Sequence, residues 1–192
     1  LEAMQERQVS VGGEVHPMAS PFFVLATQNP LEQEGTYPLP EAQQDRFLFK
    51  IFVDYPSAAE ENAIVRRVTE RAFGKIRAVL TGEDILEAQK LVTRIPVADT
   101  VIEYASTLVR STRLTDEAPD FVKNWVAWGC GPRASIALVG AAKARAALRG
   151  NPCASCDDVA AVAHPVMRHR LAVNYTARAE GLTADAVIDK LL

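Results

Sequence analysis

The chain has 192 residues, enough for one large domain or two small ones, and its apolar content of 48% is ample for a packed core. A charged fraction of 23% with a net charge of −3 gives no single-sign field, which argues against nucleic acid or a membrane surface as a partner. No apolar run approaches the ~20 residues of a membrane span, and three cysteines without a secretory signal pattern lead us to expect a reducing, cytoplasmic setting.

The first residues are interpreted as a helical turn followed by a hairpin. Residues 1–7 have the pattern of the last turns of an amphipathic helix but no start signal, so we expect the chain to begin inside an element of a longer protein. Gln8–Val11 and Glu14–His16 alternate polar and apolar residues around Gly12 and Gly13. Two short alternating runs around a Gly-Gly pair predict a β-hairpin with a primed turn.

Two apolar runs, Phe22–Thr27 and Phe47–Val53, flank a polar loop that is rich in Pro, Gly, Gln and Glu. Each run is short, dense in Phe, Val, Ile and Leu, and bounded by turn residues, which predicts a strand buried on both faces. Ligands of open α/β sheets bind beyond the carboxyl ends of the strands. Asn29 follows the first predicted strand and Arg46 directly precedes the second, so both are candidate site residues.

Each of these two candidates has a structural alternative. The amide of Asn29 suits the orientation of a water that attacks a phosphoryl group, but an Asn before Pro30 is also common in ordinary turns, and the residues alone favour the turn. The guanidinium of Arg46 suits bidentate contact with phosphate oxygens. Its alternative is a salt bridge with Asp45 or Glu41.

From about residue 57 onward every segment has a helical period, which predicts an all-α region. Ser57 with Glu60 predicts a capping box, and Thr81 and Ser155 are further N-cap candidates. Pro132 fits the first turn of a helix, where its missing N–H has no partner to lose. The predicted helices are 58–72, a segment that begins after Thr81, 97–111, 120–128, 132 to about 148, 159–174 and 183–192.

Arg133 lies in the first turn of the helix that Pro132 opens. The free N–H groups and the dipole at a helix N-terminus favour anions, so a cation there raises an already positive potential. This is poor for helix stability and good for phosphate binding; the alternative is an Arg that folds back over the helices to meet a carboxylate. Later on this helix we expect these residues to pack inward: Ile136, Val139, Gly140 and Ala144.

The sequence also contains a set of residues that resembles a zinc site. Cys153 and Cys156 form a C-x-x-C pair, and His164 and His169 follow. The axial rise from Cys156 to His164 is about 12 Å at ~1.5 Å per residue, which is too far for one metal. We therefore predict no metal site, and interpret these residues as thiols near a helix cap and as packing or interface histidines.

Three motifs, in order and with compatible spacing, resemble one family. Residues 1–47 (from LEAM through ATQNP to EAQQDRF), residues 131–135 (GPRAS) and residues 163–165 (AHP) look like the MoxR family of AAA+ ATPases. In that family the Asn of ATQNP is the sensor 1 residue and the Arg of DRF is a finger that reaches a neighbouring subunit's nucleotide. The Arg of PRAS is sensor 2. The resemblance therefore assigns these three roles to Asn29, Arg46 and Arg133.

The resemblance implies an α/β plus all-α fold. Residues 1–55 would be the C-terminal part of an AAA+ P-loop core, with the hairpin, the sensor 1 strand, the arginine-finger segment and the last strand, and residues 56–192 would be a helical lid. The implied activity is ATP hydrolysis, with ATP and Mg²⁺, that drives chaperone-like remodelling or maturation of protein complexes. A homo-oligomeric ring, which we expect to be a hexamer, is implied too. Family members often act with partners that carry von Willebrand factor A domains.

One departure from the family is serious. The phosphate loop G-x-x-x-x-G-K-[ST] occurs nowhere in the sequence, and no apolar strand ends in Asp-Glu. We therefore expect a C-terminal portion without Walker A and Walker B segments, inactive on its own. The missing central strand leads us to expect residues 1–55 to be poorly ordered, swapped between chains, or paired in a way foreign to the family. The alternative function is a non-hydrolysing helical adaptor.

Overall fold

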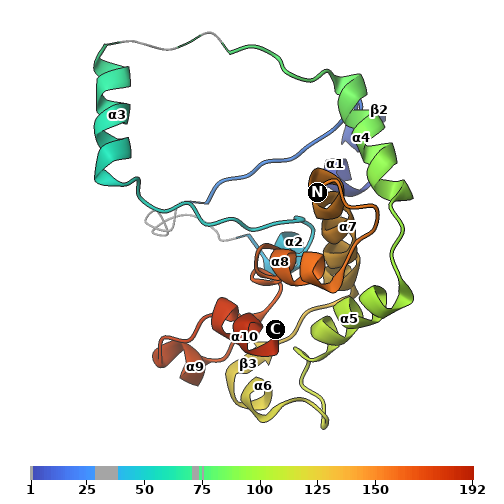
Figure 1. Ribbon diagram of the computed structural model, residues 1–192, viewed down its shortest axis with the longest axis vertical. Helices are drawn as coiled ribbons and strands as arrows, with labels where there is room; N and C mark the ends of the chain where they lie inside the picture. Colours follow the sequence, from blue (N-terminus) through green and yellow to red (C-terminus); the bar gives the residue numbers. More distant parts are fainter. Residues whose placement is uncertain (1, 29–38, 71–73, 75) are drawn as a thin grey trace.

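The computed structural model of the protein describes residues 2–28, 39–70, 74 and 76–192. Its core lies in the C-terminal half, where α5 (Asp99–Arg110), α7 (Pro132–Leu148), α8 (Cys156–Met167) and α10 (Ala184–Leu191) pack into one helical body (Figure 1). Fully buried side chains from all four helices meet there; the largest are Leu138, Met167, Ile188 and Val109. None of the helices within the described ranges is long and apolar enough to cross a membrane.

Short elements complete the helical body where the sequence predicted longer helices. α6 (Asp120–Trp125) gives way to β3 (Val126–Trp128), which pairs antiparallel with β4 (Ala172–Val173), and α9 (Tyr175–Ala179) follows. The predicted helix 159–174 is therefore wrong at its C-terminal end, since α8 stops at Met167. Pro165 lies inside the last turn of α8, and its missing N–H weakens the helix at this point.

The three predicted N-cap residues are confirmed. Each of three helices begins with a capping box, in which the side-chain oxygen of the cap residue accepts the N–H of the third helical residue. The carboxylate of that third residue accepts the N–H of the cap residue in return. The pairs are Ser57 with Glu60, Thr81 with Asp84, and Ser155 with Asp158.

Helix α3 (Ala58–Thr69) stands apart from the helical body (Figure 1), and α4 (Gly82–Arg94) lies along α7, where Lys143 donates a hydrogen bond to the Thr93 carbonyl at 2.6 Å. Neither α3 nor α4 contains a buried residue. The apolar face predicted for α3 exists, but it is open to solvent: its three members are Ile64, Val65 and Val68, which are 52%, 54% and 55% exposed.

The N-terminal hairpin forms as predicted. After α1 (Glu2–Gln5), β1 (Gln8–Val11) pairs antiparallel with β2 (Glu14–Pro17). Gly12 and Gly13 join them with φ values of 62° and 88°. Both values lie in the left-handed region that glycine adopts without strain, which is the backbone geometry of a primed turn.

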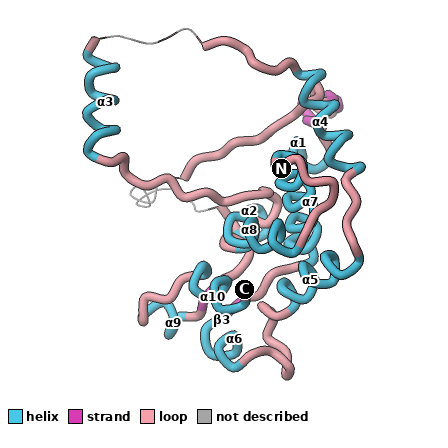
Figure 2. Tube along the Cα trace, in the orientation of Figure 1, coloured by secondary structure: helices cyan, strands magenta, loops and turns pink. Residues whose placement is uncertain are grey.

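The two strands predicted from the apolar runs are wrong. Phe22–Thr27 and Phe47–Val53 are loops (Figure 2), and Phe23 and Val53 are 83% and 92% exposed. A strand forms by hydrogen bonding to a neighbour, and in the described ranges the only strand pairs are β1 with β2 and β3 with β4. The two runs therefore do not pair with each other. Within the described residues, the alternative strand pairing that we expected for residues 1–55 is not formed either.

Only part of the predicted inner face of α7 is buried: Val139 is half-buried against the core, and Ala144 is half-buried. Ile136 is 73% exposed and Gly140 is exposed, whereas the buried residues are Ala134, Ala137, Leu138, Ala141, Ala142 and Ala146. α7 packs against both α5 and α8, and small side chains allow helices to approach closely on two sides. Apolar residues therefore occur all around α7, and a large side chain does not by itself mark the inner face: Leu138 is buried whereas Ile136 is exposed.

Candidate functional site

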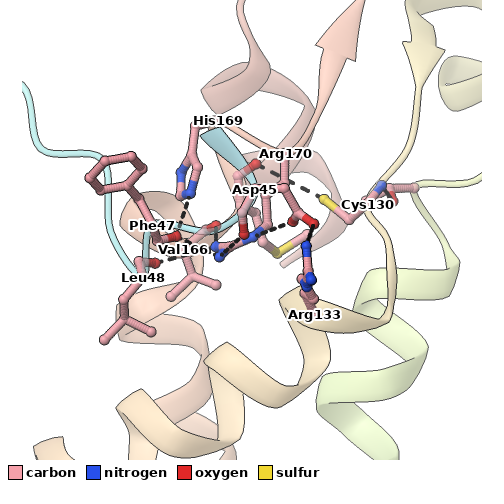
Figure 3. Close-up of polar contacts among 10 residues, drawn as sticks. Asp45, Phe47, Leu48, Cys130, Arg133, Val166, His169 and Arg170 are labelled. Atoms are coloured by element: carbon pink, nitrogen blue, oxygen red, sulfur yellow. Dashed lines mark hydrogen bonds and ion pairs between the residues drawn. The ribbon is translucent and has the colours of Figure 1, made fainter. Parts of the chain in front are cut away.

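A cleft of about 460 Å³ lies where residues 45–48 pass over the helical body. Three arginines line it, Arg46, Arg133 and Arg170, together with the carboxylate of Asp45. Figure 3 shows Arg133 and Arg170 directed at Asp45 from two different elements. We call this the arginine cleft; its remaining lining is Met4, Leu48, Ile136, Ala137 and Gly140.

Asp45, which follows α2 (Glu41–Gln44), is shared between two guanidinium groups. Its Oδ1 accepts a hydrogen bond from Arg170 Nε at 2.9 Å, and its Oδ2 lies 3.4 Å from Arg133 Nη1. The side chain of Arg170 is 3% exposed and that of Arg133 is 47% exposed. The first pair is therefore a part-buried, short, charge-assisted bond, whereas the second is a solvent-screened contact that a competing anion can displace.

Arg170 also binds the backbone on both sides of Arg46. Its Nη2 donates to the carbonyls of Asp45 and Phe47 at 3.0 and 2.6 Å, and its Nη1 donates to the carbonyl of Leu48 at 3.2 Å. Burial lowers the pKa of Arg170, and the hydrogen bond from Arg170 to Asp45 opposes that shift. The guanidinium remains charged because an arginine is not deprotonated in proteins.

The anchor for these contacts is the C-terminal end of α8. The last carbonyls of a helix have no partner within the helix. Here the Pro165 carbonyl accepts the backbone N–H of Lys50 at 2.8 Å, and the Val166 carbonyl accepts a hydrogen bond from Arg170 Nη1. Cations are also favoured at the negative end of the helix dipole. Residues 45–50 are thus fastened to the end of α8.

His169 adds a further contact to the same segment (Figure 3). Its Nε2 donates to the Phe47 carbonyl at 2.9 Å. Burial, aided by the nearby charges of Arg170 and Lys50, lowers the pKa of His169 to about 4. The imidazole is therefore neutral at pH 7, which allows it to lie beside two cations without repulsion.

Arg133 is the second residue of α7, directly after Pro132 and the cap residue Gly131. The free N–H groups of this helix end and the guanidinium together form a positive region at the rim of the arginine cleft. The alternative for Arg133 was a contact with a carboxylate across the helical region. Arg133 does contact a carboxylate, that of Asp45, but Asp45 lies in the DRF segment and not in the helical region.

Arg46 is partly buried in the arginine cleft, and no ion pair found in the described ranges includes it. The salt bridges considered for it, with Asp45 or Glu41, are not formed. Its Nε is buried, and within the described part of the chain it has no hydrogen-bond partner. An unsatisfied buried donor costs free energy, so this position favours an acceptor that enters the cleft.

The structure thus brings two of the three predicted site residues, Arg46 and Arg133, into one cleft. Asn29 lies outside the described residues. Arg170 and the shared role of Asp45 were missed from the sequence. The basic run 168–170 lay inside the predicted helix 159–174, which hid its role. Because α8 ends at Met167, the run lies at a helix C-terminus, where basic residues bind the free carbonyls.

Comparison with protein families finds two matches. Residues 1–49 match the model of the ATPase family associated with various cellular activities (AAA), and residues 121–191 match the model of the AAA lid domain. Asp45 and Arg46 lie in the first matched segment, and Arg133 and Arg170 lie in the second. The arginine cleft is therefore built from both matched segments.

Curated relatives cover the whole chain. Chaperone MoxR1 of Mycobacterium tuberculosis is 44% identical over 100% of this chain and 51% of its own length. YeaC of Bacillus subtilis, an uncharacterized protein, is 39% identical over 100% of this chain and 58% of its length. Protein MoxR of Paracoccus denitrificans is 32% identical over 86% of this chain and 53% of its length. The chain spans about half the length of these relatives.

A solved structure has the same course of the chain. The crystal structure of a protein from Cytophaga hutchinsonii, described as a candidate ATPase, superposes with a TM-score of 0.91 and 36% sequence identity. The match covers 99% of this chain and 58% of that chain. The described part of the chain therefore has the same fold as the corresponding part of that protein.

Proposed function

Because the chain belongs to the MoxR family of AAA+ ATPases, we propose that the arginine cleft serves two nucleotide sites: Arg133 acts on the nucleotide of its own subunit, and Arg46 acts on that of a neighbouring subunit. In the full-length protein these sites hydrolyse ATP and drive chaperone-like remodelling or maturation of protein complexes. One observation carries the proposal: Arg46 and Arg133 line one cleft, and the buried Nε of Arg46 has no partner in the described part of the chain.

The proposed roles follow from position and charge. Arg133, at the start of α7, contacts the phosphates as sensor 2. Arg46 neutralises charge that develops on the transferring phosphoryl group of a neighbouring subunit. Asn29 orients the attacking water as sensor 1. Residues 1–55 belong to the AAA+ core and residues 56–192 form the lid.

The cleft fits the phosphates of ATP but not its Mg²⁺. The guanidinium groups of Arg46 and Arg133 and a helix N-terminus offer donors to anionic oxygens. Asp45 is the one carboxylate that lines the cleft within the described ranges, and both of its oxygens are engaged by arginines. Mg²⁺ requires several oxygen ligands, so the metal is held by other parts of the full-length protein, and these 192 residues alone do not hydrolyse ATP.

The assembly is proposed on the same basis. A finger that acts on a neighbouring nucleotide requires a homo-oligomeric ring, which we propose to be a cytoplasmic hexamer. A protein with a von Willebrand factor A domain is the proposed partner, as in other members of the family. Neither nucleic acid nor a membrane is part of the proposal.

The second candidate is a non-hydrolysing adaptor that docks a partner by exposed helix faces. The open apolar face of α3, formed by Ile64, Val65 and Val68, favours it. The two candidates differ in whether full-length protein turns over ATP.

The test measures ATP turnover and assembly of the full-length protein. We expect Arg46→Ala to lower kcat about 1,000-fold without loss of the ring, as for other arginine fingers. We expect Arg133→Ala to weaken ATP binding and so to lower ATP turnover to near zero. A full-length protein that shows no turnover, or an Arg46→Ala variant with wild-type turnover, would reject the ATPase and leave the adaptor.

A further inference from the structure

Arg170 is the most heavily bonded side chain in the arginine cleft, and no role in the proposed reaction is assigned to it above. Its guanidinium contacts the carboxylate of Asp45 and four backbone carbonyls, those of Asp45, Phe47, Leu48 and Val166 (Figure 3). Three of these carbonyls belong to the residues that flank Arg46. The contacts thus surround the backbone of Arg46 without touching its side chain.

The geometry requires an arginine. A buried charge is tolerated only when it is paired and hydrogen-bonded, and the planar fork of a guanidinium can donate in five directions at once. A lysine would carry the same charge but only three donors on a flexible stem. It could not bind the carbonyls of residues 45–48 and the Val166 carbonyl of α8 at the same time.

We propose that Arg170 is a positioning residue, which fixes the backbone of Arg46 to the end of α8 and so aligns the finger with its target. The inference rests on the proposed function, because it assigns a task to Arg46. Arg170 does not contact the nucleotide in this account, since its side chain is 3% exposed and its donors are already engaged. Its effect on turnover passes through Arg46.

The same contacts link the finger to the lid of its own subunit. Asp45 accepts a part-buried 2.9 Å bond from Arg170 and makes an exposed 3.4 Å contact with Arg133. A phosphate that draws Arg133 away therefore breaks the weaker contact and leaves the stronger one intact. The finger remains fastened to α8 while Arg133 is free to bind the nucleotide.

The test compares kcat and KM for ATP in the full-length protein. Arg170→Lys keeps the charge and removes the fork, and we expect kcat to fall about 100-fold while KM changes less than about 3-fold. In a background that already carries Arg46→Ala, we expect Arg170→Lys to cause no further loss, because a positioning residue acts only through the residue it places. Asp45→Asn removes the ion pair between Arg170 and Asp45 from the carboxylate side. It should also slow turnover, and it should cause no further loss in the Arg46→Ala background.

Arg145→Lys is the matched control, because Arg145 also pairs with a buried carboxylate, that of Asp158, but does not line the arginine cleft. We expect it to lower the melting temperature and leave kcat unchanged. Wild-type kcat in a folded Arg170→Lys variant, or a further loss in the Arg46→Ala background, would overturn the inference. If Arg170→Lys does not fold, wild-type kcat in Asp45→Asn overturns it. Wild-type turnover of Arg46→Ala would instead reject the proposed function.

Discussion

Asp45 Oδ2 lies 3.4 Å from Arg133 Nη1, so the carboxylate that follows α2 neutralises the guanidinium at the start of α7. The two residues are 88 positions apart in the sequence, and they face each other across the arginine cleft. Arg133 is half exposed at this contact. An anion that binds Arg133 must therefore compete with Asp45.

Replacement of Asp45 by Asn removes this competitor. We expect the 192-residue chain with Asp45→Asn to bind tripolyphosphate about 3-fold more tightly than the wild type, which corresponds to the ~0.2–1 kcal/mol of an exposed ion pair. Isothermal titration calorimetry gives the affinity. Asp189→Asn is the control, because Asp189 pairs with His164 outside the cleft and its loss should change nothing. Unchanged or weaker binding by Asp45→Asn would contradict this view of the cleft.

The ion pair between Arg145 of α7 and Asp158 of α8 supports the helical body. The Asp158 side chain is 1% exposed, and besides Arg145 it accepts hydrogen bonds from the backbone and hydroxyl of Ser155. Arg145→Ala leaves this carboxylate buried with its cap bonds alone. We expect a loss of about 2 kcal/mol in unfolding free energy, measured by urea denaturation, which is less than the ~3–5 kcal/mol of a fully buried pair because Arg145 is partly exposed.

The pKa of Asp158 gives that pair a pH dependence. Burial raises this pKa, but the hydrogen bonds from Ser155 and Arg145 outweigh burial, so it lies below its ordinary value. A depressed carboxyl pKa contributes stability above the pKa of the unfolded chain and loses it as the pH falls through the folded value. Arg145→Ala should therefore lose less stability than the wild type on acidification below about pH 4. Equal acid sensitivity of the two proteins would count against the pair.

The low pKa of His169 predicts a second pH dependence of stability, at higher pH than that of Asp158. Its pKa falls from 6.5 to about 4 on folding, so below pH 6.5 the unfolded chain binds a proton that the folded chain does not. The contribution of neutral His169 to the free energy of unfolding is therefore complete above pH 6.5, and it decreases as the pH falls toward 4. We expect His169→Gln, which can still donate to the Phe47 carbonyl, to reduce the loss between pH 7.5 and 5 by about 1 kcal/mol, after allowance for solvent screening.

The control for this effect is His16→Gln. His16 is exposed on β2, so its replacement should leave the pH dependence of unfolding as in the wild type. A His169→Gln variant whose stability follows the wild-type curve between pH 7.5 and 5 would show that His169 is not buried in its neutral form.

Much of the helical region was predictable because its signals are local. The capping boxes at Ser57, Thr81 and Ser155 depend on residues three apart, and the hairpin depends on Gly12 and Gly13. The family and the AAA+ fold implied by the sequence motifs are likewise confirmed by the two family matches and the solved structure.

The predictions that failed concern features that depend on distant parts of the chain. The run Phe47–Val53 has the composition of a buried strand, but a strand forms only beside a partner, and composition does not reveal one. Ile136 is more apolar than Ala137, yet packing on two sides of α7 buries the smaller residue. Arg170 was missed because its partners at residues 45–48 are more than a hundred positions away.

The most direct test of the central claim mixes two inactive full-length variants. If Arg46 acts on a neighbouring subunit and Arg133 on its own, a ring of Arg46→Ala and Arg133→Ala subunits contains interfaces with both arginines intact. Random mixing makes about a quarter of the interfaces complete. We therefore predict that ATPase activity, near zero for each variant alone, rises on mixing toward about a quarter of the wild-type value. No recovery in rings shown to contain both variants would contradict the account.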